Sequence, residues 1–336
     1  MILSRLATIL ETDVRRPLAN ERWRRTVIFL ALMSCAGAAH AQSAVSLVLA
    51  FPPGGPADSL ARVTARQLEK ELGQPVIIEN KPGGNGAIAA NLVARSKPDG
   101  NTLFLSSIGA IAINPSLYPK LVYNPEKDFV PVAMLASSPE VLVVGHGHAI
   151  NTASEYIRQA KSSGVKMAST GVGGMSHMGI VQFKLATSAK VLHVPYKGAP
   201  PATTDTIGGQ VDGFIGDISG LLANIKAGKL KALAIAAPKR SRVLPDVPTF
   251  DEIGVPNVYV NNWYGLFAPT GTPAEKINAI NAAVQRAFTS SEMRAYAEST
   301  GVEFIAGTPQ QFAETVKRDT AHWSALIRSE GIKVDE

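Results

Sequence analysis

Cysteine is almost absent from this chain of 336 residues, in which Cys35 is the only one. Cys35 lies within an amino-terminal segment that has the features of a removable signal. Without that segment the chain would form no disulfide bond and would offer no thiol nucleophile and no thiolate metal ligand. A chain of this length can dispense with disulfides, because its hydrophobic core is large enough to stabilise the fold.

Long hydrophobic runs are also missing, and no stretch after residue 41 reaches the 18 apolar residues expected of a membrane-spanning helix. Near the amino terminus, arginines precede a short apolar run at residues 27–33, and small residues lead to A-H-A at 39–41. A basic region, a short apolar core and an A-x-A site are typical of a secretory signal. We expect residues 1–41 to be a signal peptide that is cut after Ala41, and the mature protein to be periplasmic.

Two details of this segment stay open. Arg24 and Arg25 resemble a twin-arginine signal, so export by the Sec route and by the twin-arginine route both remain alternatives. The polar lead-in before the basic region is long, which leaves the true start codon undecided.

Blocks of basic residues are absent from the rest of the sequence. The signal contains six arginines and three acidic residues, so its removal lowers the net charge from +6 to +3. A mildly basic surface without a Lys/Arg cluster predicts no nucleic-acid partner. The modest positive charge favours small anions instead. A hydrophobic content of 46% and a charged content of 18% are those of an ordinary globular protein.

Strand-like and helix-like segments alternate through most of the chain, which predicts an α/β fold with a parallel sheet. The strands are expected at residues 45–50, 76–78, 103–105, 141–144, 166–169, 191–194, 211–215 and 230–236. The helices between them are expected at residues 58–72, with Gly73 as the stop signal, and at 87–95, 153–161 and 177–186.

After Asn262 the pattern changes to three helices, expected at residues 274–289, 292–299 and 309–328. These helices need a sheet to pack on, so we expect the carboxyl terminus to return to the first domain. The resulting hypothesis is two α/β lobes with crossings near residues 140 and 264 and a ligand cleft between them. Lobe 1 would comprise residues 42–143 and 265–336, and lobe 2 residues 144–264.

A first glycine-rich loop, FPPGGPADSLAR at residues 51–62, follows the first strand and opens the first helix. Gly54 and Gly55 let backbone N–H groups approach a ligand closely, and the helix start adds partial positive charge. Asp58 is expected to cap the helix through its side chain. No Lys-Ser or Lys-Thr follows the glycines, which excludes a Walker phosphate loop. A tight turn before a capped helix remains the plain alternative.

A second glycine-rich loop, KPGGNGAIAAN at residues 81–91, matches the dinucleotide pattern G-x-G-x-x-A. Four residues, Glu79 to Pro82, separate the glycines of this loop from its strand, and the next strand ends without an acidic residue. Because both features of a dinucleotide site are missing, we expect no nucleotide cofactor.

A third loop, ASTGVGGMSHMG at residues 168–179, again joins a strand to a helix through small residues. Thr170 and Ser176 offer hydroxyl groups, and the glycines expose backbone donors. The segment from Gly174 approaches the hydrolase pattern G-x-S-x-G but has Met178 in the last position. His177 could contact a ligand or make a structural hydrogen bond. Two anion-binding loops, one in each lobe, are expected to face a single cleft.

Catalytic and metal-binding patterns are scarce. The histidines after the signal are far apart and form no HExxH motif, and the pair His146 and His148 fits a solvated turn better than a metal site. Asp212 and Asp217 flank one strand but should point in different directions; Asp217, at the carboxyl end, could reach the cleft. No acid/base pair or triad has suitable spacing. We expect no enzyme, no metal and no cofactor.

Several phrases, in this order, resemble the Bug (TctC) family, the extracytoplasmic solute receptors of tripartite tricarboxylate transporters. They are FPPGGPADSLARV, LGQPVIIENKPGGNGAIAAN, PDGNTLFLSS, NPSLYPKLVYNPEKDFVPV, HVPYKGAPPATTD, GGQVDGFIG, LPDVPTFDEIG and WYGLFAPTGTP. The resemblance implies a two-lobed periplasmic binding protein fold of the second type, acting as a monomer. It also implies a small organic carboxylate as ligand (an amino acid, a di- or tricarboxylate, or an aromatic acid) and membrane permease subunits as partners.

The resemblance further implies which residues form the site. Backbone groups and ordered waters after the first strand would hold one carboxylate, and loops of both lobes would line the cleft. The implied ligand-binding residues are Phe51, Pro53, Gly54, Gly55, Asp58, Ser106, Ser107, Gly109, Ser169, Thr170, Gly171, Gly173, His177 and Asp217.

The sequence departs from the family pattern at Gly174, where relatives often have Ser or Thr. A side-chain hydroxyl contact is therefore not expected there, although Thr170 or Ser176 could compensate. Two other functions stay open as alternatives: a ligand-sensing receptor for a signalling partner, and an exported serine hydrolase that uses Ser176 and His177.

Overall fold

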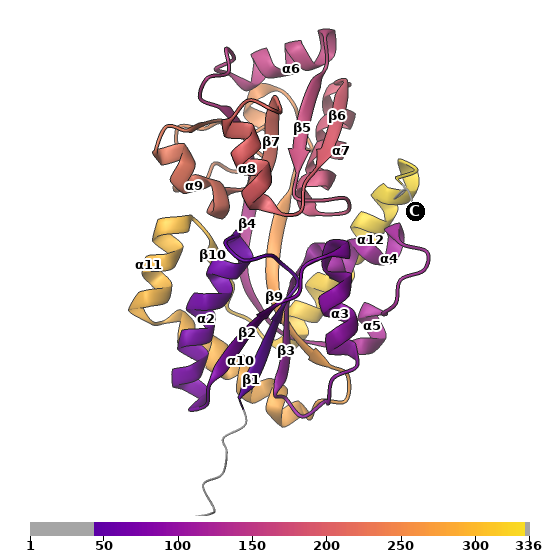
Figure 1. The fold of residues 1–336 in the computed structure, drawn as a ribbon, viewed down its shortest axis with the longest axis vertical. Coiled ribbons are helices and arrows are strands. Elements are labelled where there is room, and N and C mark those ends of the chain that lie inside the picture. The colour runs from indigo at the N-terminus through magenta and orange to yellow at the C-terminus, as the bar shows by residue number, and fades with distance from the viewer. Residues whose placement is uncertain (1–43, 333–336) are drawn as a thin grey trace, which may run out of the picture. The chain divides into compact units, whose positions relative to one another are not determined.

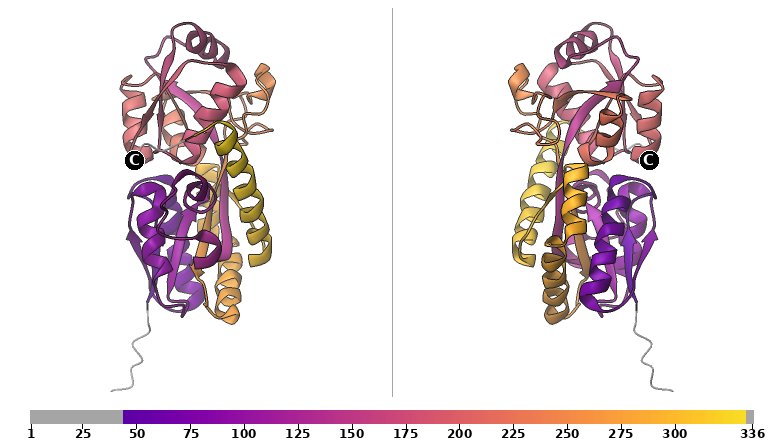
Figure 2. Two further views of the ribbon diagram at one scale, coloured as in Figure 1. Left: turned by 90° about the vertical axis from the view of Figure 1, so that its right-hand side faces the viewer. Right: turned by 90° about the vertical axis from the view of Figure 1, so that its left-hand side faces the viewer.

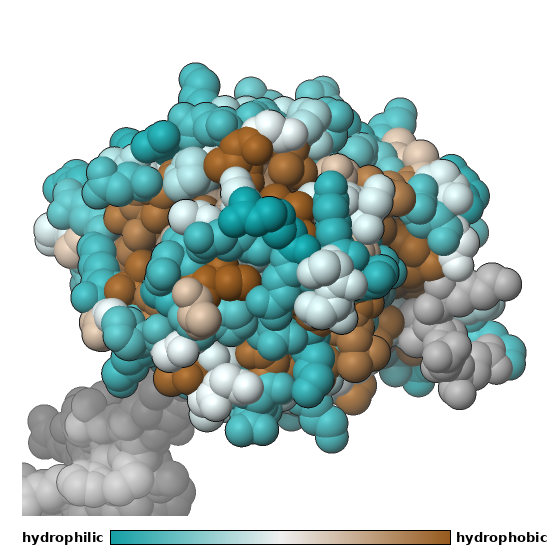
Figure 3. All heavy atoms as spheres, turned by 90° about the horizontal axis from the view of Figure 1, so that it is seen from above, coloured by the Kyte–Doolittle hydropathy of each residue, from teal (hydrophilic) through white to brown (hydrophobic). Residues whose placement is uncertain are grey.

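The computed structural model describes residues 44–332. The expected signal peptide, its cleavage after Ala41 and Cys35 therefore lie outside the described residues. Within the described residues no helix is both long and apolar enough to cross a membrane. On the face that carries α6 (Ala153–Ser162), hydrophobic residues form small patches separated by polar ones, as is normal for a surface in contact with water (Figure 3).

A first group of strands comes from distant parts of the chain. Three neighbouring strands run parallel, and two longer ones continue the sheet in antiparallel fashion. In order across the sheet they are β2 (Val76–Asn80), β1 (Val45–Leu49), β3 (Thr102–Ser107), β9 (Asn261–Pro269) and β4 (Phe129–Gly145). The short β10 (Glu303–Phe304) also pairs with β4.

Helices cover both faces of this group (Figures 1 and 2). Successive residues of a strand point to opposite faces, so Leu47 and Val48 of β1 belong to two different hydrophobic clusters. One face packs against α2 (Pro56–Leu72), α10 (Ala274–Phe288) and α11 (Ser291–Thr300). The other face packs against α3 (Ala87–Ala94), α12 (Pro309–Ser329) and the short segments η1 (Gly84–Gly86), η2 (Gly109–Ile113), α4 (Asn114–Leu117) and α5 (Pro125–Asp128). The carboxyl-terminal helices α10, α11 and α12 thus pack on the first group.

A second group of strands surrounds the carboxyl-terminal part of β4. It consists of β7 (Gly213–Asp217), β5 (Val165–Ser169), β6 (Val191–Pro195) and β8 (Leu230–Ile235). β5 runs parallel to both β6 and β7, whereas β7 and β8 run antiparallel to β4. Its helices are α6, α7 (Met175–Thr187), α8 (Ala199–Ile207) and α9 (Ile218–Lys226), and η3 (Asp251–Ile253) precedes β9.

The two groups meet where β4 changes partners. Pro139 of β4 pairs with Asn261 of β9, and the next residue, Glu140, pairs with Asp217 of β7. The Glu140 amide also donates to the carbonyl of Val260, just before β9 begins. These two adjacent passages of the chain join the halves of the two-lobed α/β fold that the sequence predicts (Figure 1). The exact lobe boundaries, at residues 143 and 264, stay a prediction.

The expectation of a parallel sheet is wrong for the central strands, because β4 and β9 both run antiparallel to their neighbours. β4 begins at Phe129, well before the predicted start at residue 141. Two prolines lie inside it, and a proline within a run argues against a strand. Pro131 lies at an irregularity in the pairing with β9, and Pro139 is the last residue paired with β9, so the strand tolerates both.

Candidate ligand-binding cleft

A cavity of about 620 Å³ lies between the two groups of strands. The first group contributes the loop after β1, the loop at residues 82–86 and the end of β3. The second group contributes the loops after β5 and β6 and the end of β7. Carboxyl ends of parallel strands in both groups therefore face one space, which is where ligands bind in open α/β folds.

Half of the residues predicted for the site line this cavity. They are Phe51, Gly55, Ser106, Ser107, Thr170, Gly171 and Asp217. The other half belong to the same or adjoining segments but not to the cavity lining: Pro53, Gly54, Asp58, Gly109, Ser169, Gly173 and His177. A direct role of any of these residues in binding stays a prediction.

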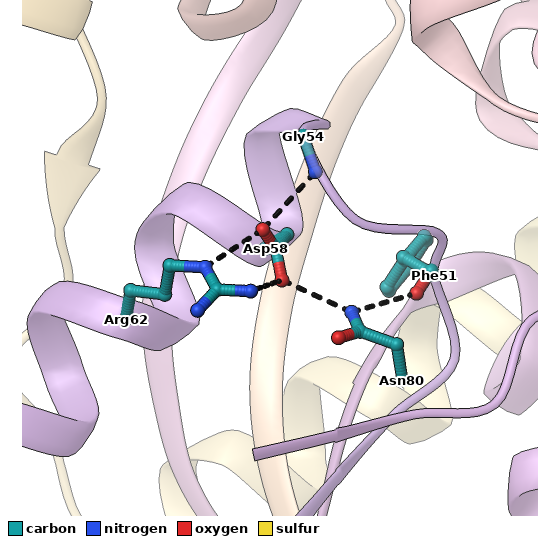
Figure 4. A network of polar contacts seen from close by, with 5 residues as sticks. All are labelled: Phe51, Gly54, Asp58, Arg62 and Asn80. Atoms are coloured by element: carbon teal, nitrogen blue, oxygen red, sulfur yellow. Dashed lines mark hydrogen bonds and ion pairs between the residues drawn. The ribbon is translucent and has the colours of Figure 1, made fainter.

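Asp58 holds the loop after β1 in place from beneath (Figure 4). Its Oδ2 accepts hydrogen bonds from the Gly54 amide at 3.0 Å and from Arg62 Nε at 2.9 Å. Its Oδ1 accepts from Arg62 Nη2 at 3.1 Å and from Asn80 Nδ2 at 3.0 Å, and that Asn80 nitrogen also donates to the carbonyl of Phe51. One buried carboxylate thus fixes both ends of the turn.

The expected capping role of Asp58 is therefore wrong in detail. Helix α2 begins at Pro56, its N-cap residue is Gly55, and no side chain caps it. Burial alone would raise the pKa of Asp58, but the hydrogen bonds from Arg62, Gly54 and Asn80 and the charge of Arg62 outweigh it and lower the pKa. Asp58 is consequently an ionised support of the loop.

The start of α2 forms part of the cavity wall that the first group contributes. Gly54 has a φ of +81°, which glycine adopts without strain, and its N–H is directed to Asp58. Gly55, Pro56 and Ala57 line the cavity. Because the first N–H groups of a helix have no partner within the helix, they can donate to an anion, and the helix dipole adds to the attraction.

The loop after β5 supplies the opposite face. Ser176 is fully buried, and its Oγ accepts from the Thr170 amide at 2.8 Å and lies 2.9 Å from Thr170 Oγ1. A Cβ placed on Gly174 would lie 3.0 Å from that Thr170 hydroxyl. Thr170, which lines the cavity, thus puts a hydroxyl beside the position where a side chain is missing, whereas Ser176 supports the loop from within.

His177 supports the same loop. Its Nδ1 accepts a hydrogen bond from the Gly173 amide at 3.2 Å, and its ring stacks on His193 with 4.2 Å between centroids. His193 Nε2 in turn is 2.6 Å from Ser169 Oγ. Burial, followed by the charges of His193 and Lys184, lowers the pKa of His177 to about 4, so the ring is neutral at pH 7. The contacts match the structural alternative for His177 rather than a nucleophile–base pair with Ser176.

Asp217 forms part of the cavity floor. Its Oδ1 accepts from Ser138 Oγ at 2.5 Å and from the amide and hydroxyl of Ser219 at 2.9 and 2.6 Å, the amide contact capping α9. Its Oδ2 accepts from the Tyr264 hydroxyl at 2.7 Å. The prediction that Asp217 reaches the cleft is confirmed, and four donors already occupy its carboxylate.

Glu140 and Asn262 are cavity residues that the sequence analysis missed. Glu140 is 3% exposed and Asn262 is 7% exposed, and among the described residues neither Glu140 Oε2 nor Asn262 Oδ1 has a hydrogen-bond partner. Burial, and then the charge of Asp217, raises the pKa of Glu140 well above its ordinary value. In the sequence, the feature that could have indicated this part of the site is Glu140 itself, a lone acidic residue inside the apolar stretch at residues 132–144.

Asn85 is a further missed residue of the cavity lining. Its backbone has a φ of +48°, which is uncommon outside glycine. Its Nδ2 donates to Asn114 Oδ1 and to the carbonyl of Gly173, both at 2.8 Å. In sequence the loop at residues 81–91 resembles a nucleotide motif, whereas in the structure its residues 82–86 line the cavity.

The fold and the cleft together define a two-lobed solute-binding protein of the periplasmic class. BugD, described as a periplasmic binding protein, superposes with a TM-score of 0.81 at 31% identity, over 86% of this chain and 98% of that one. The sequence model of the tripartite tricarboxylate transporter family receptor, TctC, matches residues 60–332. The chain belongs to this family, whose members are solute receptors.

Further known proteins are similar to this chain. BugT of Bordetella pertussis is 34% identical over 86% of this chain and 90% of its own length. MatC from Rhodopseudomonas palustris, solved with bound malate, is 34% identical over 84% and 98% of the two chains, with a TM-score of 0.79. A second R. palustris protein, solved with adipate, is 30% identical over 88% and 100%, with a TM-score of 0.83.

Proposed function

We propose that this protein is a periplasmic receptor that binds a small organic carboxylate and delivers it to the permease subunits of a tripartite tricarboxylate transporter. The observation that carries the proposal is the cavity in which the start of α2 faces the loop after β5. Malate in MatC and adipate in the second R. palustris protein support a carboxylate as the ligand class. The family description supports the transporter as partner.

In this proposal one carboxylate of the ligand lies between the two loops. The free N–H groups at the start of α2 donate to it from one side, near Gly55 and Ala57, and the Thr170 hydroxyl, which lines the cavity, reaches it from the other. Hydrogen bonds to an ionised acceptor are stronger than neutral ones, and bridging waters can complete the set. Closure of the lobes around the ligand would be a hinge movement at the passages through Glu140 and Asn261.

A thermal-shift screen of the chain from Gln42 onward tests the proposal. The panel contains malate, citrate, adipate, benzoate and several amino acids, with neutral sugars as the comparison. A ligand at about 100 times its Kd stabilises the folded state by about 2.7 kcal/mol, which raises Tm by several degrees at this chain length. Stabilisation by a sugar with no response to any carboxylate would overturn the proposal.

A cavity-filling variant locates the site. The φ of Gly55 is −86°, and a Cβ added there has no neighbour closer than 3.9 Å, so Gly55→Leu is compatible with the backbone but occupies the cavity. Gly147→Leu is the matched control, because a Cβ added at Gly147 has no neighbour within 4 Å and the residue does not line the cavity. We expect the first variant to abolish the ligand-induced shift and the second to retain it.

A growth experiment tests the transport step. Deleting the receptor should prevent growth on the ligand that the screen identifies, and restoring it should restore growth. Unimpaired growth would favour the signalling alternative, in which the receptor reports the ligand to a sensor.

A further inference from the structure

The floor of the cavity carries hydrogen-bond acceptors that have no donor. Glu140 comes from β4 and Asn262 from β9, and both line the cavity. The described residues provide no hydrogen-bond partner for Glu140 Oε2 or for Asn262 Oδ1, although both atoms are buried. An unpaired buried carboxyl group costs stability, so its presence in a cavity wall points to a partner supplied from outside.

The charge around these two residues is negative. Asp217, directly opposite Glu140 in the pairing of β4 with β7, accepts four hydrogen bonds and has little capacity left for a ligand. Lys197 is the one basic residue among the residues described as lining the cavity, and it is exposed to solvent. No ion pair joins Lys197 to Glu140 or Asp217 in the described part of the chain.

We propose that Glu140 and Asn262 form a second polar subsite that binds a cationic hydrogen-bond donor of the ligand, so that the preferred ligand is an amino carboxylate. This inference rests on the proposed function, because the carboxylate end of the same ligand lies between the start of α2 and the loop after β5. The ammonium group donates to Glu140 and to Asn262 Oδ1, and its positive charge opposes the effects of burial and Asp217 that raise the pKa of Glu140, so that Glu140 ionises when the ligand binds. Glu140 is then a specificity-determining residue.

The same arrangement disfavours a second carboxylate at the floor. Such a group would bring another negative charge close to Asp217 and would face the Asn262 Oδ1 acceptor without a donor to bind. A binding site rejects the wrong ligand when binding would bring like charges together or leave hydrogen-bond acceptors unpaired. A neutral hydroxyl could donate to Glu140 but would leave the negative charge of the floor uncompensated.

Four probes of similar length test this inference by calorimetry at pH 7.5. Pentanoate has no second polar group, norvaline adds an ammonium beside the carboxylate, 5-aminopentanoate places it at the far end, and adipate replaces it with a carboxylate. We expect at least one of the two amino acids to bind at least tenfold more tightly than both pentanoate and adipate. Binding of pentanoate or adipate with no such advantage for either amino acid would overturn the inference and leave the proposed function intact.

A variant pair assigns the preference to Glu140. Glu140→Gln keeps the shape but removes the charge, so the advantage of the preferred amino acid over pentanoate should fall at least tenfold. Glu298→Gln is the matched control, because Glu298 is exposed and does not line the cavity. An unchanged advantage in Glu140→Gln would overturn the assignment. If that variant does not fold, the selectivity of the unmodified protein still decides the inference.

Two further outcomes distinguish a failure of the cationic preference from a failure of the proposed function. If 5-hydroxypentanoate binds as tightly as the preferred amino acid, the subsite takes a neutral donor and the cationic preference is wrong. If no carboxylate of any kind binds, the proposed function itself fails, and the inference fails with it.

Discussion

The side-chain nitrogen of Asn85 lies 2.8 Å from the carbonyl oxygen of Gly173, and this hydrogen bond joins the two groups of strands across the cavity. Asn85 belongs to η1 in the first group, whereas Gly173 lies in the loop between β5 and α7 of the second. Asn114 fixes the orientation of the Asn85 side chain by accepting a second hydrogen bond. The pair thus acts as a latch between the loop at residues 82–86 and the loop after β5.

Removal of this latch should make the cleft open more readily. Asn85→Gly keeps the positive φ of +48° without strain and removes only the amide. Loss of one neutral hydrogen bond is worth about 0.5–1.5 kcal/mol, so we expect ligand to dissociate about 2–10 times faster. A biosensor measurement with the carboxylate found in the screen gives the rate. Asn257→Gly is the matched control, since Asn257 also has a positive φ, of 68°, and is exposed. Equal dissociation rates in the two variants would show that Asn85 does not act as a latch.

The carboxylate of Asp58 should stabilise the fold in a pH-dependent manner. Its pKa is lowered in the folded protein, so the stabilisation is fully present above the unfolded value of about 3.9 and is lost as the pH falls through the folded value. Asp58→Asn should therefore cost about 1–3 kcal/mol at pH 7 and progressively less below pH 4. Urea unfolding at several pH values measures the difference. Asp246→Asn, at an exposed position, should show no such effect, and a pH-independent loss in Asp58→Asn would speak against an ionic role.

Local patterns in the sequence were sufficient to predict the elements that flank the loops after β1 and β5. The pair β1 and α2 consists of an aliphatic run, a glycine-rich turn and a helix with an apolar face, and the pair β5 and α7 has the same pattern. In each pair these signals lie within about 25 residues. Helices α10, α11 and α12 begin and end within two residues of the predicted limits, because proline or serine marks each start.

The floor of the cavity could not be predicted in the same way. Glu140 and Asn262 are 122 positions apart, and only the pairing of β4 with β9 brings them together. β9 begins with two asparagines and β4 contains two prolines, so neither strand has the local pattern that would reveal it. Asp58 also could not be interpreted correctly from local sequence. Its position near a helix start predicted a cap. Its carboxylate is directed to the loop instead by Arg62 and Asn80, and these contacts form only in the folded chain.

Glu140 should lower the stability of the protein without ligand. Burial raises its pKa, so the folded state is penalised as the pH rises above the unfolded value of about 4.3, up to the folded value. Glu140→Gln should consequently be more stable than the unmodified protein at pH 7, by about 1–3 kcal/mol, and equal to it near pH 4. Melting temperatures from pH 4 to 9 test this difference, with Glu298→Gln expected to follow the unmodified protein throughout. A destabilised Glu140→Gln at pH 7 would show that Glu140 serves the fold rather than the ligand.

The stacked pair of His177 and His193 should make the loop after β5 sensitive to acid. The pKa of His177 is lowered to about 4 from an ordinary value near 6.5, so its contribution is present above pH 6.5 and is lost as the pH falls toward 4. Protonation of Nδ1 would place a proton against the Gly173 amide, whose hydrogen bond it now accepts, and would also bring positive charge onto His193. We expect the unmodified protein to lose about 2–3 kcal/mol of stability between pH 6.5 and pH 4 through this residue, and His177→Gln to lose less. His322→Gln serves as the control, because His322 is exposed. If the two variants show the same dependence of unfolding free energy on pH, the acid sensitivity arises elsewhere and His177 is only a packing residue.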